Sequence, residues 1–174
     1  MSYGLEGKLA AATFETSVRT PAVETVRAYL NGEFRLGASL VLSGPTGVGK
    51  SWAAACAING LVGYSRYFWY VPSLASALLA LDRRERVMSD VGSVECAVMD
   101  DLGVEYLKPG GLLEVMLDEI VWRRENLALA TIFTTNLSPE ELRDRLSDRI
   151  ISRLRGWGKT MRVNGPDLRE SPTS

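Results

Sequence analysis

Gly44-Pro45-Thr46-Gly47-Val48-Gly49-Lys50-Ser51 fits the phosphate-loop pattern G-x-x-x-x-G-K-[ST] at every specified position. The apolar run at 38–43 before it predicts a buried strand, and the alanine-rich run at 51–59 after it predicts a helix. Glycines let the backbone turn its N–H groups toward an anion, and the start of a helix adds partial positive charge. The stretch therefore predicts a triphosphate site rather than a turn that only packs a helix on a sheet.

The side chains of this stretch have separate expected roles. Lys50 would reach the β and γ phosphates of a nucleotide, and the Ser51 hydroxyl would bind Mg²⁺. ATP and Mg²⁺ are therefore the expected ligands. We predict that the nucleotide contacts run along the loop and the first helical turn, through Gly44, Pro45, Thr46, Gly47, Val48, Gly49, Lys50, Ser51 and Trp52.

A second chemical signal is the short apolar run at 95–103, which ends in Asp100 and Asp101 before Leu102 and Gly103. A strand of this kind carries its terminal acid to the carboxyl edge of a parallel sheet, where the phosphate loop also lies. Asp100 is expected to hold Mg²⁺ through its water shell, and Asp101 to position the attacking water. Alone the pattern is weak, because strands leaving a core commonly meet acidic loop residues. Behind a complete phosphate loop it predicts a Walker B strand.

The rest of the chain alternates between strands and helices. Apolar periodicity predicts helices at 17–34, 72–81 and 112–126, a helix from Ser138 through Leu154, and strands at 67–71, 127–135 and 159–163. In the helix at 112–126 we expect the apolar face to be buried and the charged residues, Glu114 and Arg124 among them, to lie outside. We predict one α/β core at 14–169, a flexible lead-in at 1–13 and a tail at 170–174.

Composition narrows the class of protein. The chain has 174 residues, of which 46% are hydrophobic and 24% charged, as in ordinary globular domains. With a formal charge of −1, the chain has no overall electrostatic attraction to nucleic acid, so DNA binding would need a local patch of positive charge. The lack of histidine excludes His-based catalysis and metal ligation, and Cys56 and Cys96 are expected to be buried thiols. The longest apolar stretch, 74–81, is too short to span a bilayer, and no targeting peptide is evident, so we expect a cytoplasmic protein with no membrane partner.

Two groups of arginines and one asparagine have alternative interpretations. Arg145, Arg149 and Arg153 recur every fourth residue beside an apolar stripe, either as a solvated basic face or as a row facing a neighbouring subunit's phosphate. Asn136 is either a turn residue or a reader of the γ phosphate. The charged segment at 82–86 is either a solvated helix end or a binding site.

The ordered segments GPTGVGKS, CAVMDDLG, TIFTTN, NLSPEELRDRLSDRIISRLRG and GPDLR resemble the AAA+ core of the DnaC/IstB family, bacterial helicase loaders and transposition helper ATPases. The resemblance covers residues 14–169. It implies a RecA-like P-loop NTPase core with a five-stranded parallel sheet in the order 5-1-4-3-2 and helices on both faces. It also implies ATP and Mg²⁺ as ligands and a homo-oligomeric ring or spiral in which each ATP lies between two subunits.

The resemblance also implies roles for matched residues. Lys50 and Ser51 are the Walker A pair, Asp100 is the magnesium acid, Asp101 the hydrolytic acid, and Asn136 the first sensor. Arg153 matches the arginine finger that acts on the neighbouring subunit, with Arg149 as its rival. The family's insertion helix would fall within 73–93 and line the path of single-stranded DNA, which makes Arg83, Arg84 and Arg86 candidate phosphate contacts.

Three departures from the family pattern qualify these expectations. Asp101 stands where AAA+ proteins generally have Glu, so slow hydrolysis is expected. No counterpart of the second-sensor arginine or of the helical lid is expected after Val163. The phosphate loop begins at Gly44 without the family's partner-binding region before it, so we expect either an excised ATPase domain or a short homologue.

The function predicted from these residues is an ATPase that assembles on single-stranded DNA and loads a replicative helicase. A helper that delivers target DNA to a transposase is the alternative within the same mechanism. A small-molecule kinase that uses the same loop, and a nucleotide-bound scaffold without useful turnover, are the alternatives from other classes.

Overall fold

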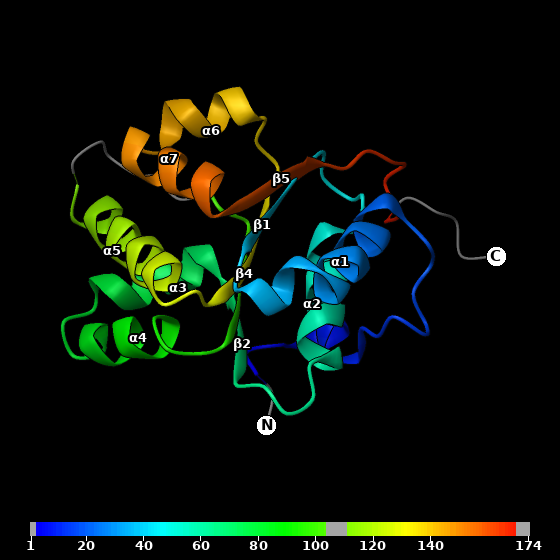
Figure 1. Ribbon diagram of the computed structural model, residues 1–174, viewed down its shortest axis with the longest axis horizontal. Coiled ribbons are helices and arrows are strands. Elements are labelled where there is room, and N and C mark those ends of the chain that lie inside the picture. The colour runs from blue at the N-terminus through cyan, green and yellow to red at the C-terminus, as the bar shows by residue number, and fades with distance from the viewer. Residues whose placement is uncertain (1–2, 104–110, 170–174) are drawn as a thin grey trace.

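A five-stranded parallel sheet organises the protein, seen in a computed structural model that describes residues 3–103 and 111–169 (Figure 1). Its strands are β1 (Ser39–Ser43), β2 (Arg66–Tyr70), β3 (Cys96–Asp100), β4 (Ala130–Thr135) and β5 (Gly158–Arg162). They lie in the order β2-β3-β4-β1-β5, and every neighbouring pair is parallel. This confirms the predicted order 5-1-4-3-2, read from the opposite edge. The tail predicted at 170–174 lies outside the described residues.

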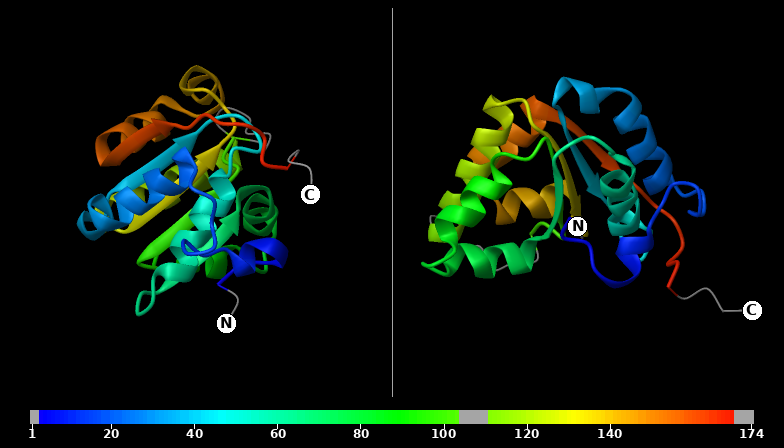
Figure 2. Two further views of the ribbon diagram at one scale, coloured as in Figure 1. Left: turned by 90° about the vertical axis from the view of Figure 1, so that its right-hand side faces the viewer. Right: turned by 90° about the horizontal axis from the view of Figure 1, so that it is seen from below.

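Helices cover both faces of the sheet, as predicted (Figures 1 and 2). One face carries α1 (Pro21–Asn31), α2 (Lys50–Gly60) and the 3-10 helix η1 (Gly7–Ala11), while η2 (Glu33–Leu36) follows α1. The other face carries α3 (Val71–Leu79), α4 (Arg84–Val91), α5 (Leu112–Asn126), α6 (Pro139–Arg145) and α7 (Asp148–Trp157). No helix among residues 3–103 and 111–169 is long and apolar enough to cross a membrane.

The core lies in two layers, one on each side of the sheet. Leu40 and Leu42 of β1 pack into the layer under α1 and α2, whereas Val41 packs into the opposite layer, because successive side chains of a strand point to opposite faces. The strands β1, β3 and β4 are buried along their whole length. Their carboxyl ends are therefore held firmly at one edge of the sheet, where the phosphate loop and the two acids lie.

The predicted lead-in packs against this core over its described part. Leu5 and Ala12 are buried, and the Phe68 N–H of the outer strand β2 donates to the Tyr3 carbonyl at 2.8 Å. The Asn59 amide of α2 donates to the Ala12 carbonyl at 2.8 Å, among other carbonyls of this segment. The sequence did not predict these contacts, because isolated apolar residues form no periodic pattern that would indicate a buried segment.

The single helix predicted from Ser138 through Leu154 is two helices. Leu146 adopts extended backbone angles (φ −111°, ψ 147°) between α6 and α7, and Ser147 is the N-cap residue of the second helix. Ser138 does cap α6, since its side chain accepts from the Glu141 N–H while Glu141 reaches back to the Ser138 N–H. The stripe Leu142, Leu146, Ile150 and Leu154 is buried as predicted, although a break interrupts the helix.

The prediction that Glu114 and Arg124 lie on the solvent-facing side of α5 is wrong, because both side chains are buried. Arg124 is completely inaccessible to solvent. Its guanidinium donates to the Thr131 hydroxyl and to the backbone carbonyls of Val91, Val94, Leu129 and Ala130 at 2.7–3.4 Å. These five hydrogen bonds replace the hydration that the charged group loses on burial. Apolar periodicity does not reveal such contacts, so the sequence did not predict that Arg124 is buried.

Candidate functional site: the phosphate loop and its carboxylates

The phosphate loop connects β1 to α2 at the carboxyl edge of the sheet, and glycine is required at two of its positions. Gly47 and Gly49 have φ of 84° and 89°, a region that side chains disfavour. A Cβ on Gly47 would also lie 1.9 Å from a carboxylate oxygen of Asp167. The loop then enters α2 directly, so its backbone N–H groups and the helix start point toward the same space.

Lys50 lies inside this loop and is only 5% exposed. Its ammonium group donates to the carbonyls of Gly44 and Pro45 at 2.8 and 2.7 Å and to the Asn136 side-chain oxygen at 2.8 Å. Burial lowers the pKa of Lys50, while the negative charges of Asp101 and Asp100 oppose that shift. The lysine is therefore held by neutral acceptors, which a phosphate with full negative charge can replace.

Asp100 ends β3 next to Ser51, the first residue after Lys50. The Thr134 hydroxyl donates to the Asp100 carboxylate at 2.6 Å, and the Ser51 side chain also hydrogen bonds to it. Burial raises the pKa of Asp100, and these two hydrogen bonds counteract the rise. The sequence predicted Ser51 and Asp100 as a pair, and the structure brings them together. It did not predict Thr134 of β4, because threonine in a strand is most simply explained by β propensity.

These oxygens fit a hydrated divalent cation beside a triphosphate. Across residues 3–103 and 111–169 no cluster of three or more Cys, Asp or Glu could hold a metal by itself. Mg²⁺ typically keeps several waters and binds through one or two protein oxygens together with phosphate oxygens. The Ser51 hydroxyl and the Asp100 carboxylate supply that small donor set.

Asp101 and Asn136 form a hydrogen-bonded chain with Lys50. The Asn136 amide donates to the Asp101 carboxylate at 3.3 Å, and its oxygen accepts from Lys50. Asp101 has φ of 61°, in the left-handed region, and its N–H donates to the Thr134 hydroxyl at 3.0 Å. The strained backbone turns Asp101 away from β3 and toward Asn136. The sequence named all three residues as catalytic candidates, and here they are in contact.

The segment after β5 returns to the phosphate loop. The Leu168 N–H donates to the Gly47 carbonyl at 3.0 Å, and the Asp167 side chain lies against Gly47. Arg169 pairs with Asp167 at 3.3 Å, and its positive charge contributes to the lowered pKa of Lys50. Arg169 thus lies in the segment that returns to the loop, and the expectation that no arginine after Val163 corresponds to a second sensor stays a prediction.

A cavity of about 160 Å³ opens beside the loop between the start of α1 and Leu168. Val18, Val23 and Trp52 give it apolar walls, and the Trp52 N–H donates to the Ser17 hydroxyl at 2.7 Å. Gly49 at the floor links the cavity to the phosphate loop. Trp52, which the sequence predicts as a nucleotide contact, lines this cavity together with Val18 and Leu168. The sequence did not single out the last two, because residues so far from the loop in the chain carry no motif.

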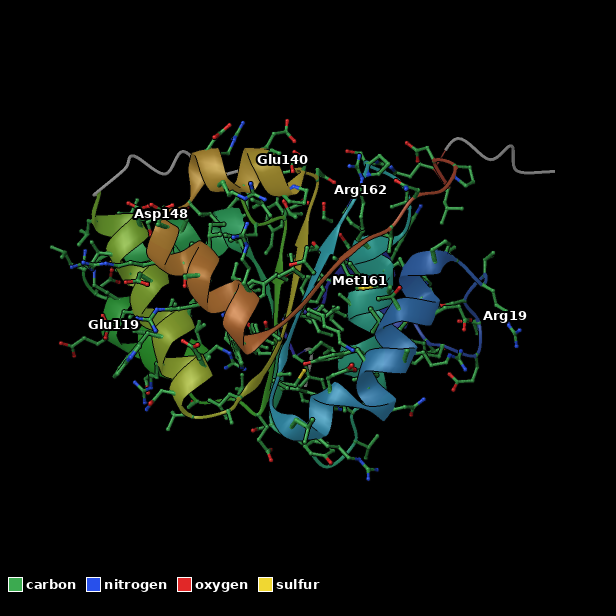
Figure 3. All side chains as sticks on the ribbon, turned by 45° about the horizontal axis from the view of Figure 1, so that its top comes forward. Arg19, Glu119, Glu140, Asp148, Met161 and Arg162 are labelled. Carbon is green, nitrogen blue, oxygen red and sulfur yellow. The ribbon has the colours of Figure 1, made fainter. Side chains whose placement is uncertain are left out.

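The arginine row is divided among different contacts. The Arg145 guanidinium donates to the Gly103 carbonyl at 2.9 Å, whereas Arg149 is exposed on α7. Arg153 pairs with Asp118 and Glu125 of α5 at 3.3 and 2.9 Å, and the Glu125 contact in particular raises its pKa. No arginine of the row meets Lys50 or Asp100 within the described chain, so an action on a neighbouring subunit stays a prediction. Charged residues of α6 and α7, including Glu140 and Asp148, project from the same side of the molecule (Figure 3).

The candidate DNA contacts lie at the start of α4. Arg83 and Arg86 are exposed and approach Asp82 and Asp90 at 3.5 and 3.8 Å. Arg84 is partly buried, and its guanidinium donates to the Leu78 carbonyl at 2.9 Å. These residues lie between β2 and β3 in the chain, and their role as DNA contacts stays a prediction.

In sequence the chain is similar to replicative helicase loaders. The chain is 30% identical over 125 residues to the replicative helicase loader DnaC of Escherichia coli K12, covering 68% of this chain and 50% of DnaC. It is 30% identical over 112 residues to the replicative helicase loader DnaI of Bacillus subtilis, covering 62% of this chain and 36% of DnaI. The chain thus spans half or less of the length of these curated relatives. No protein-family model matches the chain.

Structural comparison agrees on the fold. A crystal structure of DnaI superposes with a TM-score of 0.80 at 23% identity, over 95% of this chain and 94% of that one. The replication initiator DnaA bound to AMPPCP and single-stranded DNA superposes with a TM-score of 0.77 at 22% identity, over 91% of this chain and 52% of that one. At these identities the likeness establishes the fold.

Proposed function

From the DnaC-like AAA+ ATPase core that this chain contains, we propose that the protein binds and slowly hydrolyses ATP and uses it to assemble on single-stranded DNA and load a replicative helicase. The observation that carries this proposal is the hydrogen-bonded chain Lys50–Asn136–Asp101 beside the Ser51–Asp100 pair. It combines a phosphate-binding cation, a magnesium donor set and a water-orienting acid at one edge of the sheet.

Each residue has a defined task in this proposal. The adenine would occupy the apolar cavity beside Trp52, which places the phosphates against the loop N–H groups. Lys50 would exchange its carbonyl and amide acceptors for phosphate oxygens, which frees the Asn136 oxygen to orient the attacking water together with Asp101. Mg²⁺, held by Ser51 and Asp100, would neutralise phosphate charge. Arg169 would add a cation from the same chain once it leaves Asp167.

Hydrolysis is proposed to depend on a second subunit. In this chain Arg153 is held by two carboxylates of α5 and stands away from its own phosphate loop. A guanidinium supplied by a neighbour is worth about 10³–10⁵ in rate in other phosphoryl-transfer sites. We therefore expect the isolated subunit to turn over slowly and the assembled one faster. Arg149, which is exposed on the same helix, is the rival for this role.

The proposed partners are inferred from the relatives of this chain and not from the geometry of its site. DnaC and DnaI are named as replicative helicase loaders, and a DnaA structure of the same fold contains single-stranded DNA. These relatives favour a replicative helicase over a transposase as the partner. A cytoplasmic location and a ring or spiral assembly stay predictions.

Sedimentation with ADP and with a non-hydrolysable ATP analogue, each with and without an oligonucleotide, tests the proposal. Assembly with the ATP analogue that strengthens with DNA and is lost in Arg153→Ala supports the switch and identifies the finger. Arg149→Ala is the matched variant one helical turn earlier. A monomer under every condition contradicts it. Parallel capture with a purified replicative helicase and with a transposase separates the two possible partners.

A further inference from the structure

The segment that follows β5, residues 163–169, lies along the phosphate loop. A Cβ on Gly44 at the start of the loop would lie 2.0 Å from the Val163 carbonyl oxygen. Farther along the segment, Leu168 borders the apolar cavity that Trp52 lines. Figure 1 shows the segment leaving β5 on the side of the sheet that α1 and α2 cover. A nucleotide in the loop would therefore have this segment as its neighbour.

Asp167 of this segment places a negative charge against the loop. A Cβ on Gly47 would lie 1.9 and 2.5 Å from the two carboxylate oxygens of Asp167, so the carboxylate lies directly over that glycine. The next residue, Leu168, donates its N–H to the Gly47 carbonyl at 3.0 Å. The hydrogen bond from the Arg169 N–H lowers the pKa of Asp167, which is therefore ionised at neutral pH. A loop built to attract phosphates thus has a carboxylate fixed at its edge.

Arg169 shields this negative charge. Its N–H donates to the Asp167 carboxylate at 2.9 Å, and its guanidinium approaches the same oxygen at 3.3 Å. The pair is partly exposed, and exposed ion pairs add little stability, so a phosphate can replace Asp167 as the partner of the guanidinium. The charge of Arg169 already acts on Lys50. When the guanidinium turns to a phosphate, Asp167 becomes an unshielded negative charge beside a negatively charged nucleotide.

We propose that Asp167 sets the affinity of this site for nucleotides, as a carboxylate that repels the phosphates and that Arg169 shields in the empty site. This role rests on the proposed function, because it concerns the same nucleotide site. The repulsion weakens binding of every phosphate-bearing nucleotide and acts most strongly on the one with the largest charge. A site of this kind releases its nucleotide readily, which suits the proposed cycle of assembly and release.

Calorimetric titration with ADP and with a non-hydrolysable ATP analogue, with Mg²⁺ present, tests this role. Asp167→Asn keeps an oxygen that can accept from the Arg169 N–H and removes the charge. It should raise the affinity for both nucleotides by about three- to tenfold, and the gain should be larger for the ATP analogue. The gain should shrink as salt rises from about 0.05 M to about 0.5 M, because salt screens exposed charges. A merely structural role would not depend on salt in this way.

The ion pair between Glu33 and Lys159 supplies a matched control. Its exposure is nearly the same as that of the first pair, with 32% for Glu33 and 64% for Lys159 against 31% for Asp167 and 64% for Arg169. Glu33 lies in η2 before β1, whereas the phosphate loop follows the other end of that strand. Glu33→Gln changes the net charge as Asp167→Asn does and should leave nucleotide affinity unchanged. Thermal unfolding of every variant reports that it has folded.

Arg169→Gln tests the shielding. Without the guanidinium, the Asp167 carboxylate faces the phosphates unshielded, so affinity for the ATP analogue should fall below that of the wild type. Asp167→Asn should then add at least as much affinity in this background as it adds to the wild type. No gain in this background would overturn direct repulsion by Asp167.

The other outcomes separate this role from the proposed function. If the wild type binds neither nucleotide, the proposed function fails at its first step, and the role of Asp167 fails with it. If the wild type binds but Asp167→Asn matches Glu33→Gln, only the role of Asp167 is overturned. Weaker binding by Asp167→Asn would also overturn it, because the carboxylate would then hold the segment in place for the nucleotide.

Discussion

Two buried cations lie at opposite ends of β4 and show how the same physical problem is solved for two purposes. Arg124, at the start of β4, is completely buried, and burial lowers its pKa to about 10. Lys50, beside the end of β4, is nearly buried, and burial lowers its pKa too. Neither cation has an ion pair within the described chain, and both rely on neutral acceptors.

The difference lies in what surrounds the acceptors. Arg124 takes four backbone carbonyls and a threonine hydroxyl from the ends of β3, β4 and α4, where every partner is fixed by the fold. Lys50 takes two loop carbonyls and the side chain of Asn136, which is exposed. The first cation ties elements together, whereas the second keeps partners that a phosphate can displace. Burial of a charge therefore indicates function only where the partners can be exchanged.

The substitution Arg124→Met tests the structural role of the first buried cation, and we expect it to have the largest effect of the changes considered. Loss of the guanidinium leaves several buried carbonyls without donors, so we expect the free energy of unfolding to fall by about 3–5 kcal/mol. Urea denaturation measures this. Arg123→Met, the exposed neighbour on α5, is the control and should change stability by less than about 0.5 kcal/mol. A loss equal to that of the control would show that water replaces the guanidinium.

The substitution Lys50→Ala tests the functional role of the second buried cation. Two of its three hydrogen-bond partners, Pro45 and Asn136, are exposed, so the unfolding free energy should change by no more than about 1 kcal/mol. The affinity for an ATP analogue should fall by about 100-fold, because a charge-assisted contact to the phosphates is lost. Calorimetric titration of the nucleotide checks this result. An Arg124-like loss of stability with unchanged nucleotide affinity would reverse the two assignments.

Asn136→Ala sharpens the comparison by removing the exchangeable partner alone. Nucleotide binding should persist, because Lys50 keeps its two loop carbonyls before the phosphates arrive. The rate of phosphate release should fall by roughly tenfold or more, at the low end for positioned groups that act in the transition state. Thr135→Ser, a conservative change at the buried end of β4, serves as the control. Equal losses of binding and turnover would place Asn136 in ground-state binding instead.

The pH dependence of Asp100 should give the smallest effect. Because its pKa is raised, it takes up protons at higher pH in the folded state than in the unfolded state, so falling pH through that region stabilises the unliganded protein. Mg²⁺ binding needs the ionised carboxylate, so magnesium-dependent nucleotide affinity should fall over the same range. Parallel titrations of wild type and Asp100→Asn measure both effects. Identical pH profiles for the two proteins would contradict the assignment.

Local sequence patterns were sufficient to predict the features that depend on residues close together in the chain. The phosphate loop, the acids at the end of β3 and the helix start at Ser138 were all predicted, because each depends on backbone geometry and spacing within a few residues. The strand order followed from the family resemblance. The same reasoning failed for α5, where Arg124 was expected to face solvent but is the largest fully buried side chain among residues 3–103 and 111–169, and for the predicted single helix, which divides at Leu146.

The sequence by itself thus identified the candidates for the chemistry: a phosphate loop, a candidate magnesium acid and a candidate water-orienting pair. Only the tertiary structure decided which groups complete that chemistry. The Thr134 hydroxyl on Asp100 and the Leu168 N–H on the Gly47 carbonyl both join segments that lie far apart in the chain. The physical reason is that the environment of a buried charge is set by its neighbours in space, and the packing of strands and loops at the edge of the sheet brings those neighbours together.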